Sequence, residues 1–243
     1  MPRIWLFEVL TLLALLVIVL LVLESRPGNQ RMGDGEARAI ECLKEIAAAQ
    51  KKHRERSGRY AFLTELLGTQ KPSSSLAPLL ALPAERYDGK VPDATAGEGI
   101  YELGGSGYLF QVFLPSARGY GVVPGGAQPF DDEESRELWS AIAWPREFGV
   151  TGKRTIYIHH DGELFHTENL GIPYDGGKSI PSWDAGLRDR TLGMGGPPVG
   201  DRSHGTDTKI WERVGGPRKE ERQKKRAKER GTSDKATAGA KRD

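Results

Sequence analysis

The sequence predicts an α+β fold in which a long N-terminal helix packs on a small antiparallel sheet. Two observations lead to this prediction. Helical patterns cover residues 4–23 and 36–56, and the middle of the chain contains segments that alternate as strands do. An amphipathic helix must bury its apolar stripe, and the apolar face of a sheet is the simplest partner for it. The helix is expected to have a transmembrane half and an amphipathic half.

The transmembrane half is the stretch Ile4–Leu23, twenty residues in which Glu8 is the only ionisable side chain. A helix of that length spans about 30 Å, the hydrocarbon thickness of a bilayer. The run is longer than a signal-peptide core, and no small-residue cleavage site follows it. These features predict an uncleaved anchor in a single-pass protein of the cell (inner) membrane. The few basic residues around the run favour a cytoplasmic N-terminus, residues 1–3, and a C-terminal domain outside the cytoplasm.

The amphipathic half follows a juxtamembrane break that is predicted over residues 24–35, where a Pro-Gly pair interrupts the helical pattern. From residue 36 to residue 56, apolar side chains recur at three- and four-residue spacing, with charged residues between them. We expect Ile40, Leu43 and Ile46 to pack this helix on the sheet. Cys42, the only cysteine, excludes an intrachain disulfide and is expected to be a small buried residue of the same helix.

Three segments predict three or four antiparallel strands: "GYLFQVFLP", "LWSAIAWP" and "KRTIYIHHDGELFHT". The first alternates two sets of side chains and ends at a proline. The third contains Asp161-Gly162, a dipeptide typical of a tight turn, between two runs rich in β-branched and aromatic residues. With the amphipathic helix, these strands give a domain over residues 36–167.

The remaining sequence has weaker patterns. Residues 168–215 are rich in Gly and Pro and predict an irregular region, in which "TKIWERV" is one further short strand or turn. Residues 216–243 contain eleven Lys or Arg against five Asp or Glu and no large apolar residue. We expect this segment to be a disordered basic tail with a net charge of +6. The rest of the chain then has a net charge of −4, because the total is +2.

The order of these elements resembles the type IV pilin and secretion-system pseudopilin superfamily. The residues that carry the resemblance are the apolar run, "AIECLKEIAAAQKKHRERSGRYAFLTELLG" and the three strand segments, the last of which closes in an Asp-Gly turn. The resemblance covers about residues 4–167. It implies a pilin-like fold, with a membrane-embedded helix that continues into an amphipathic half and packs on a sheet.

The resemblance also gives Glu8 a role. Family members have a glutamate five residues into the apolar helix, after a glycine at which a peptidase cuts, and Glu8 matches that glutamate when Ile4 is the first mature residue. Arg3 stands where the family has the glycine, which argues against processing. The resemblance implies that Glu8 pairs with the N-terminal amine of a neighbouring subunit. The alternative is that Glu8 lies near the interface and extends its carboxylate into the headgroups.

The sequence contains one cluster of metal-capable side chains, in which His159, Asp161 and His166 are weak candidate ligands. Two histidines and a carboxylate can hold a metal ion if the hairpin brings them together. The alternative is that Asp161 makes the turn and the histidines are ordinary strand residues. "GVTGKRT" lacks the first glycine and the Ser or Thr of a phosphate loop. No catalytic frame, cofactor motif or small-molecule substrate is evident, so we expect no cofactor and no enzymatic activity.

These observations predict a non-enzymatic component or relative of a pilus or secretion-type assembly. Its expected partners are membrane lipid, other pilin-like subunits and, through the basic tail, anionic envelope polymers. The alternative is a membrane-anchored envelope module, which binds cell-wall or other anionic polymer through its domain or its tail and does not assemble.

Overall fold

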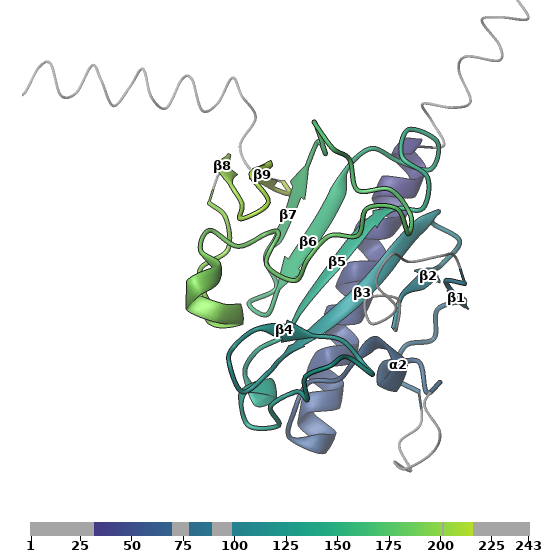
Figure 1. Ribbon diagram of the computed structural model, residues 1–243. Coiled ribbons are helices and arrows are strands. Elements are labelled where there is room, and N and C mark those ends of the chain that lie inside the picture. Colours follow the sequence, from purple (N-terminus) through teal and green to yellow (C-terminus); the bar gives the residue numbers. More distant parts are fainter. Residues whose placement is uncertain (1–31, 70–77, 89–98, 201, 216–243) are drawn as a thin grey trace, which may run out of the picture.

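The computed structural model describes residues 32–69, 78–88, 99–200 and 202–215. These residues form an α+β fold, in which a long helix over residues 32–57 lies along one face of a single antiparallel sheet (Figure 1). The predicted fold class is therefore confirmed at this level. The predicted anchor Ile4–Leu23, with Glu8, and the predicted tail, residues 216–243, lie outside the described residues. Among the helices within the described ranges, none is long and apolar enough to cross a membrane.

The sheet is larger than expected, with nine strands in the described residues. Its order is β1-β2-β3-β5-β6-β7-β9-β8, and the short β4 pairs with β3 outside this series. The strands are β1 Ala84–Arg86, β2 Tyr101–Leu103, β3 Tyr108–Pro115, β4 Gly121–Val122, β5 Ser140–Pro145, β6 Thr155–His159, β7 Leu164–Thr167, β8 Ser203–His204 and β9 Ile210–Arg213. The small sheet predicted from three segments accounts only for β3, β5, β6 and β7. The other five strands have two to four residues each, too few for an alternating pattern to stand out.

The β6–β7 hairpin has the predicted turn. Ile158 pairs with Leu164, and the carboxylate of Asp161 accepts a hydrogen bond of 2.8 Å from the backbone N–H of Glu163. Gly162 has a φ of 84°, a conformation that glycine adopts without strain. The Asp-Gly dipeptide therefore fixes both the place of the turn and the register of the two strands.

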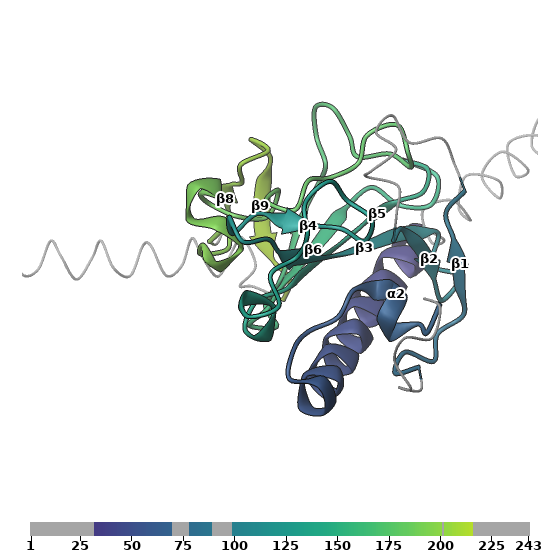
Figure 2. The same ribbon diagram turned by 60° about the horizontal axis from the view of Figure 1, so that its bottom comes forward.

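The central strands are buried on both faces. In β3, Tyr108, Phe110, Val112 and Leu114 belong to the core on the helix side, as the alternation predicts. Leu109 and Phe113, which point the other way, belong to a second core on the opposite face. Figure 2 shows the resulting three layers: the long helix, the sheet, and the chain that crosses the outer face.

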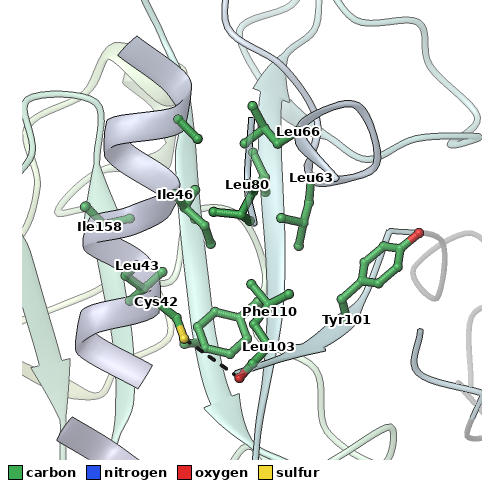
Figure 3. Packing of buried hydrophobic residues seen from close by; sticks show 14 of the residues in the cluster. Cys42, Leu43, Ile46, Leu63, Leu66, Leu80, Tyr101, Leu103, Phe110 and Ile158 are labelled. Atoms are coloured by element: carbon green, nitrogen blue, oxygen red, sulfur yellow. Dashed lines mark hydrogen bonds between the residues drawn. The ribbon is translucent and has the colours of Figure 1, made fainter. Parts of the chain in front are cut away.

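The long helix packs through the predicted stripe. Leu43 and Ile46 are completely buried against the sheet, near Phe110 and Ile158 (Figure 3), whereas Ile40 is only partly buried at the edge of this core. Cys42 is also buried, and its thiol donates to the carbonyl of Leu103 at 3.8 Å. Burial raises the pKa of this thiol to about 11.

The predicted break over residues 24–35 is wrong for its described part, because residues 32–35 are already helical. Gly35 explains the difference. A side chain at this position would collide with the backbone carbonyls of Ser106 and Thr151, so the glycine lets the helix approach the loops that flank β3 and β6. Gly35 therefore serves close packing at the start of this helix. Residues 24–31 lie outside the described residues.

A glutamine closes the corner after the long helix. The backbone N–H of Gly58 bonds the carbonyl of Arg54, with Gly58 at a φ of 81°, as expected where a helix ends. The buried amide of Gln50 then bonds both backbone groups of Ala61, with distances of 2.7 and 2.8 Å. This contact directs the chain into the short helix α2, Leu63–Leu66, whose leucines join the same core.

The outer face of the sheet is covered by residues 168–200, the first part of the region 168–215 that was predicted to be irregular. Its regular structure is limited to a short 3₁₀ helix, η2, over Arg190–Gly195. Large side chains hold it in place: Tyr174, Trp183 and Leu187 are buried against the sheet, and the indole N–H of Trp144 donates to the carbonyl of Gly176 at 2.9 Å. The chain then returns into the sheet through β8 and β9, so "TKIWERV" contributes a strand rather than a turn.

Candidate functional site

The hairpin separates the three candidate metal ligands. His159 Nδ1 lies 3.2 Å from a carboxylate oxygen of Asp161, and the His159 side chain is almost completely buried. His166 pairs with Ile156 across the hairpin, which puts it on the helix side of the sheet. Ring contact with Tyr157 instead places His159 towards the outer core. Side chains alternate along a strand, and the observed register gives His159 and His166 opposite faces.

The described residues contain no group of three or more His, Cys, Asp or Glu side chains that could hold a metal ion. A contact between His159 and Asp161 supplies two of the three ligands, and His166 does not approach them. The hypothesis of a metal site at these three residues is therefore not supported by the geometry. The hairpin instead gives Asp161 the turn role that was the alternative.

Two histidines of this part of the sheet, His160 and His166, have lowered pKa values, which favour the neutral imidazole. Burial, together with the neighbouring His159 ring at 3.9 Å between centroids, lowers the pKa of His160 to about 4. Burial also lowers the pKa of His166, with a smaller effect from the nearby Arg154. Both imidazoles are thus uncharged at neutral pH. Within the described part of the chain, Nδ1 of each has no hydrogen-bond partner.

A serine–histidine contact occurs at the end of the long helix, where Ser57 Oγ lies 2.8 Å from His53 Nδ1. The hydroxyl also lies within hydrogen-bond distance of the backbone carbonyls of His53 and Arg59, and the His53 ring nitrogen contacts the Arg59 carbonyl at 3.0 Å. These contacts tie the last turn of the helix to the corner after it. The pair closes the helix end, and its geometry is not that of a nucleophile with a free general base.

A hollow of about 590 Å³ in the described surface lies beside β7, β9 and the loop after β7. Its centre is an ordered polar cluster. The Lys209 ammonium donates to the carbonyls of Leu170 and Ile172, at 3.1 and 2.6 Å, and lies 4.9 Å from the centre of the Tyr174 ring. The Tyr174 hydroxyl in turn donates to Asp207 at 2.7 Å. Burial lowers the pKa of Lys209.

The rim of this hollow is apolar. Leu170 and Ile172 have 77% and 82% of their surface exposed, although the cluster beneath them holds their backbone. Sequence patterns do not predict this region, because its residues come from separate segments of the chain, most of them in the irregular part. One signal was present: two large aliphatic residues on either side of a glycine in "NLGIPY", without the spacing of a helix or strand.

A second hollow of about 580 Å³ lies between the C-terminal half of the long helix and the β6–β7 turn. Lys51 and Arg54 line one side, and His160 and Gly162 line the other. The aromatic rings at its base, Tyr60 and Trp139, are nearly buried, so they offer a bound molecule little flat surface. The lining of this hollow combines cationic side chains with the carboxylates of Glu55 and Asp161.

Comparisons with known proteins add no assignment. No family model matches the chain, and neither the curated proteins nor the solved structures contain a significant match.

Proposed function

We propose that this chain is a single-pass, membrane-anchored, pilin-like or pseudopilin-like protein, a non-enzymatic component or relative of a pilus or secretion-type assembly. One observation carries the proposal. Only residues 24–31 separate the apolar stretch Ile4–Leu23 from the helix that packs lengthwise on the antiparallel sheet, so one N-terminal segment joins an anchor-length apolar run to the core of the domain.

The corner after the helix also supports the proposal. The segment "AIECLKEIAAAQKKHRERSGRYAFLTELLG", which carries part of the resemblance to pilins, contains an "AQ" dipeptide and a Gly-Arg-Tyr sequence. Gln50 of the first bonds Ala61, which directly follows the second. The two short motifs therefore belong to one structural unit, the joint between the long helix and α2. Such a joint gives these residue types a physical reason to occur together.

Subunit pairing through Glu8 is the testable part of the proposal. An unpaired carboxylate in the apolar layer of a membrane is costly, which favours a partner in a neighbouring subunit. We expect Glu8→Ala to weaken self-association of the full chain in lipid nanodiscs or detergent about tenfold, the range of a polar contact between membrane helices. Analytical ultracentrifugation measures this change. Glu133→Ala, which removes an exposed carboxylate of a loop, is the matched control.

The alternative is an anchored envelope module, and the charge of the tail favours it. Residues 216–243 carry a net charge of +6, which suits anionic polymers. Self-association that is unchanged in Glu8→Ala, together with polymer binding that is lost when residues 216–243 are removed, would support the module and contradict the assembly. The N-terminal residue of the protein from its own membranes is a second criterion, because a mature start at Ile4 means pilin-type processing despite Arg3.

A further inference from the structure

Exposed apolar side chains gather at one end of the domain. Six large apolar side chains are exposed in the described residues. Four of them, Val150, Leu170, Ile172 and Ile210, belong to loops or strand ends on one side of the sheet, where the strands begin or end. At this end of the domain β5 ends, β6 begins, and β7 ends beside the beginning of β9. An arrangement of this kind indicates a contact surface, since single exposed apolar residues are normally scattered.

This end is also where the described part of the long helix begins. Glu36 accepts hydrogen bonds from the backbone N–H groups of Lys153 and Arg154, and Arg154 bonds Glu168, just before the loop of Leu170 and Ile172. Figure 1 shows the start of the helix, the β5–β6 loop and the loop after β7 at the same end of the domain. The ion pairs connect all three segments.

The chain outside the described residues brings this end towards the bilayer. Only residues 24–31 separate the predicted anchor, which ends at Leu23, from residue 32. Nine peptide units reach at most about 32 Å, even when fully extended. The headgroup layer of a bilayer occupies about 5–7 Å of that distance. Of the two ends of the domain, this one therefore lies nearer the lipid.

The loop after β7 is built to present its aliphatic side chains outward. Asn169, at a φ of 59°, bonds both backbone groups of Tyr174 through its side-chain amide, which closes the loop on itself. Lys209 holds the carbonyls of Leu170 and Ile172 from inside. The polar backbone of the loop tip is thus partly satisfied by the protein, which reduces the cost of moving the tip into an apolar layer.

The charges at this end permit contact with a lipid surface. The carboxylates of Glu36 and Glu168 both pair with Arg154, and Glu212 pairs with Arg202. Lys153, beside Val150, is exposed and makes no ion pair within the described part of the chain. Asp34 and Glu147 at this end are also exposed, so lipid headgroups meet charges of both signs, several of them in ion pairs.

We propose that Val150, Leu170 and Ile172 insert into the interfacial layer of the bilayer that holds the anchor, so that this end of the domain contacts the membrane. The proposal rests on the membrane anchoring in the proposed function, but not on assembly into a filament. It fixes the orientation of the domain relative to the lipid and leaves the opposite end free for partners.

The test uses the full chain, reconstituted into phosphatidylcholine vesicles that contain a lipid with a shallow nitroxide quencher. An environment-sensitive fluorophore is attached to Leu170→Cys or, in a separate protein, to Ile172→Cys. Leu192→Cys is the matched control. Leu192 is also exposed, but it lies in η2, which contacts the loop after β3 at the opposite end of the domain. The native Cys42 is buried, and the raised pKa of its thiol makes its labelling slow.

We expect the labels at positions 170 and 172 to be quenched about threefold more strongly than the label at position 192, with a blue-shifted emission. Equal quenching at positions 170 and 192, in a chain that co-floats with the vesicles, would overturn this proposal and leave the anchoring intact. A chain that does not co-float would overturn both. A blue shift without quenching, dependent on protein concentration, would assign the surface to a second copy and contradict insertion.

Discussion

The two faces of the sheet are covered in different ways. On one face, the long helix buries a regular stripe that includes Leu43 and Ile46. On the other, residues 168–200 have little regular structure, and the contact depends on a few large side chains and on glycines that allow close approach. A sheet face can therefore be covered without a periodic pattern of apolar residues. An irregular chain does the same when rings such as Trp144 and Trp183 supply the apolar area.

The substitution with the largest expected effect tests whether residues 168–200 contribute as much to the stability of the domain as the long helix does. Trp144→Ala removes a fully buried indole from the outer core and leaves the carbonyl of Gly176 without its donor. We expect a loss of about 4 kcal/mol in the free energy of unfolding, measured by urea denaturation of the full chain in detergent. Hydrogen exchange then sharpens the comparison. Loss of protection confined to residues 168–200 would mean that this layer is a separate, weaker unit, whereas loss in the long helix as well would mean one cooperative domain.

The corresponding change on the helix side is Leu43→Ala. Leu43 is completely buried between the helix and the sheet, so we expect a loss of about 3 kcal/mol in the same denaturation experiment. Ile40→Ala is the control, because Ile40 lies at the partly buried edge of the same stripe and should cost less. An equal loss in the two variants would contradict the observed rotation of the helix on the sheet.

A pair of glycine substitutions gives a smaller effect of opposite sign in the two regions. In Gly186→Ala the new methyl group would overlap the buried ring of Tyr157, so we expect a loss of about 1–3 kcal/mol. Gly33→Ala adds a methyl group to the long helix with no neighbour within 4 Å, and the better helix propensity of alanine should stabilise by about 0.5–1 kcal/mol. An unchanged free energy of unfolding in Gly186→Ala would show that residues 168–200 shift readily to make room for the methyl group. Thermal unfolding midpoints of the two variants provide the measurement.

An effect of similar size is a pH dependence at the edge of the helix layer. The pKa of His160 is lowered from 6.5 to about 4, so between these values the unfolded chain binds more protons than the folded one. Stability must therefore rise with pH in this range, and it falls as the pH drops below 6.5. Between about pH 7.5 and about pH 5 we expect His160 to contribute a loss of about 1 kcal/mol, because the group is partly exposed to solvent.

His160→Gln should reduce this pH-dependent loss, which urea midpoints at the two pH values measure. His204→Gln, which removes an exposed imidazole, is the control. His159, Asp161 and Glu137 are the titratable groups that act on His160, and they remain in both variants. An unchanged slope in His160→Gln would assign the pH dependence to other groups, among them His166, whose pKa is also lowered.

The sequence by itself determined the elements whose patterns are local. The stripe of Leu43 and Ile46 repeats with the period of a helix, β3 alternates between two cores, and the Asp161-Gly162 dipeptide encodes a turn within a few residues. The apolar length of Ile4–Leu23 likewise predicts an anchor without reference to a fold. The sequence also permitted His159 and His166 to meet, because only the strand register decides which face each side chain takes.

The tertiary structure alone decided the outer layer, the short flanking strands and the apolar end of the domain. Trp144 meets Gly176, and Lys209 meets Leu170, across separations of tens of residues, and no short-range pattern records such contacts. The helical start at residue 32 has the same origin, since Gly35 is favoured there by loops far along the chain. The period of apolar residues in one segment predicts which of its faces packs against a neighbouring layer. The contact between two irregular segments has no such period, because it depends on how the rest of the molecule is folded.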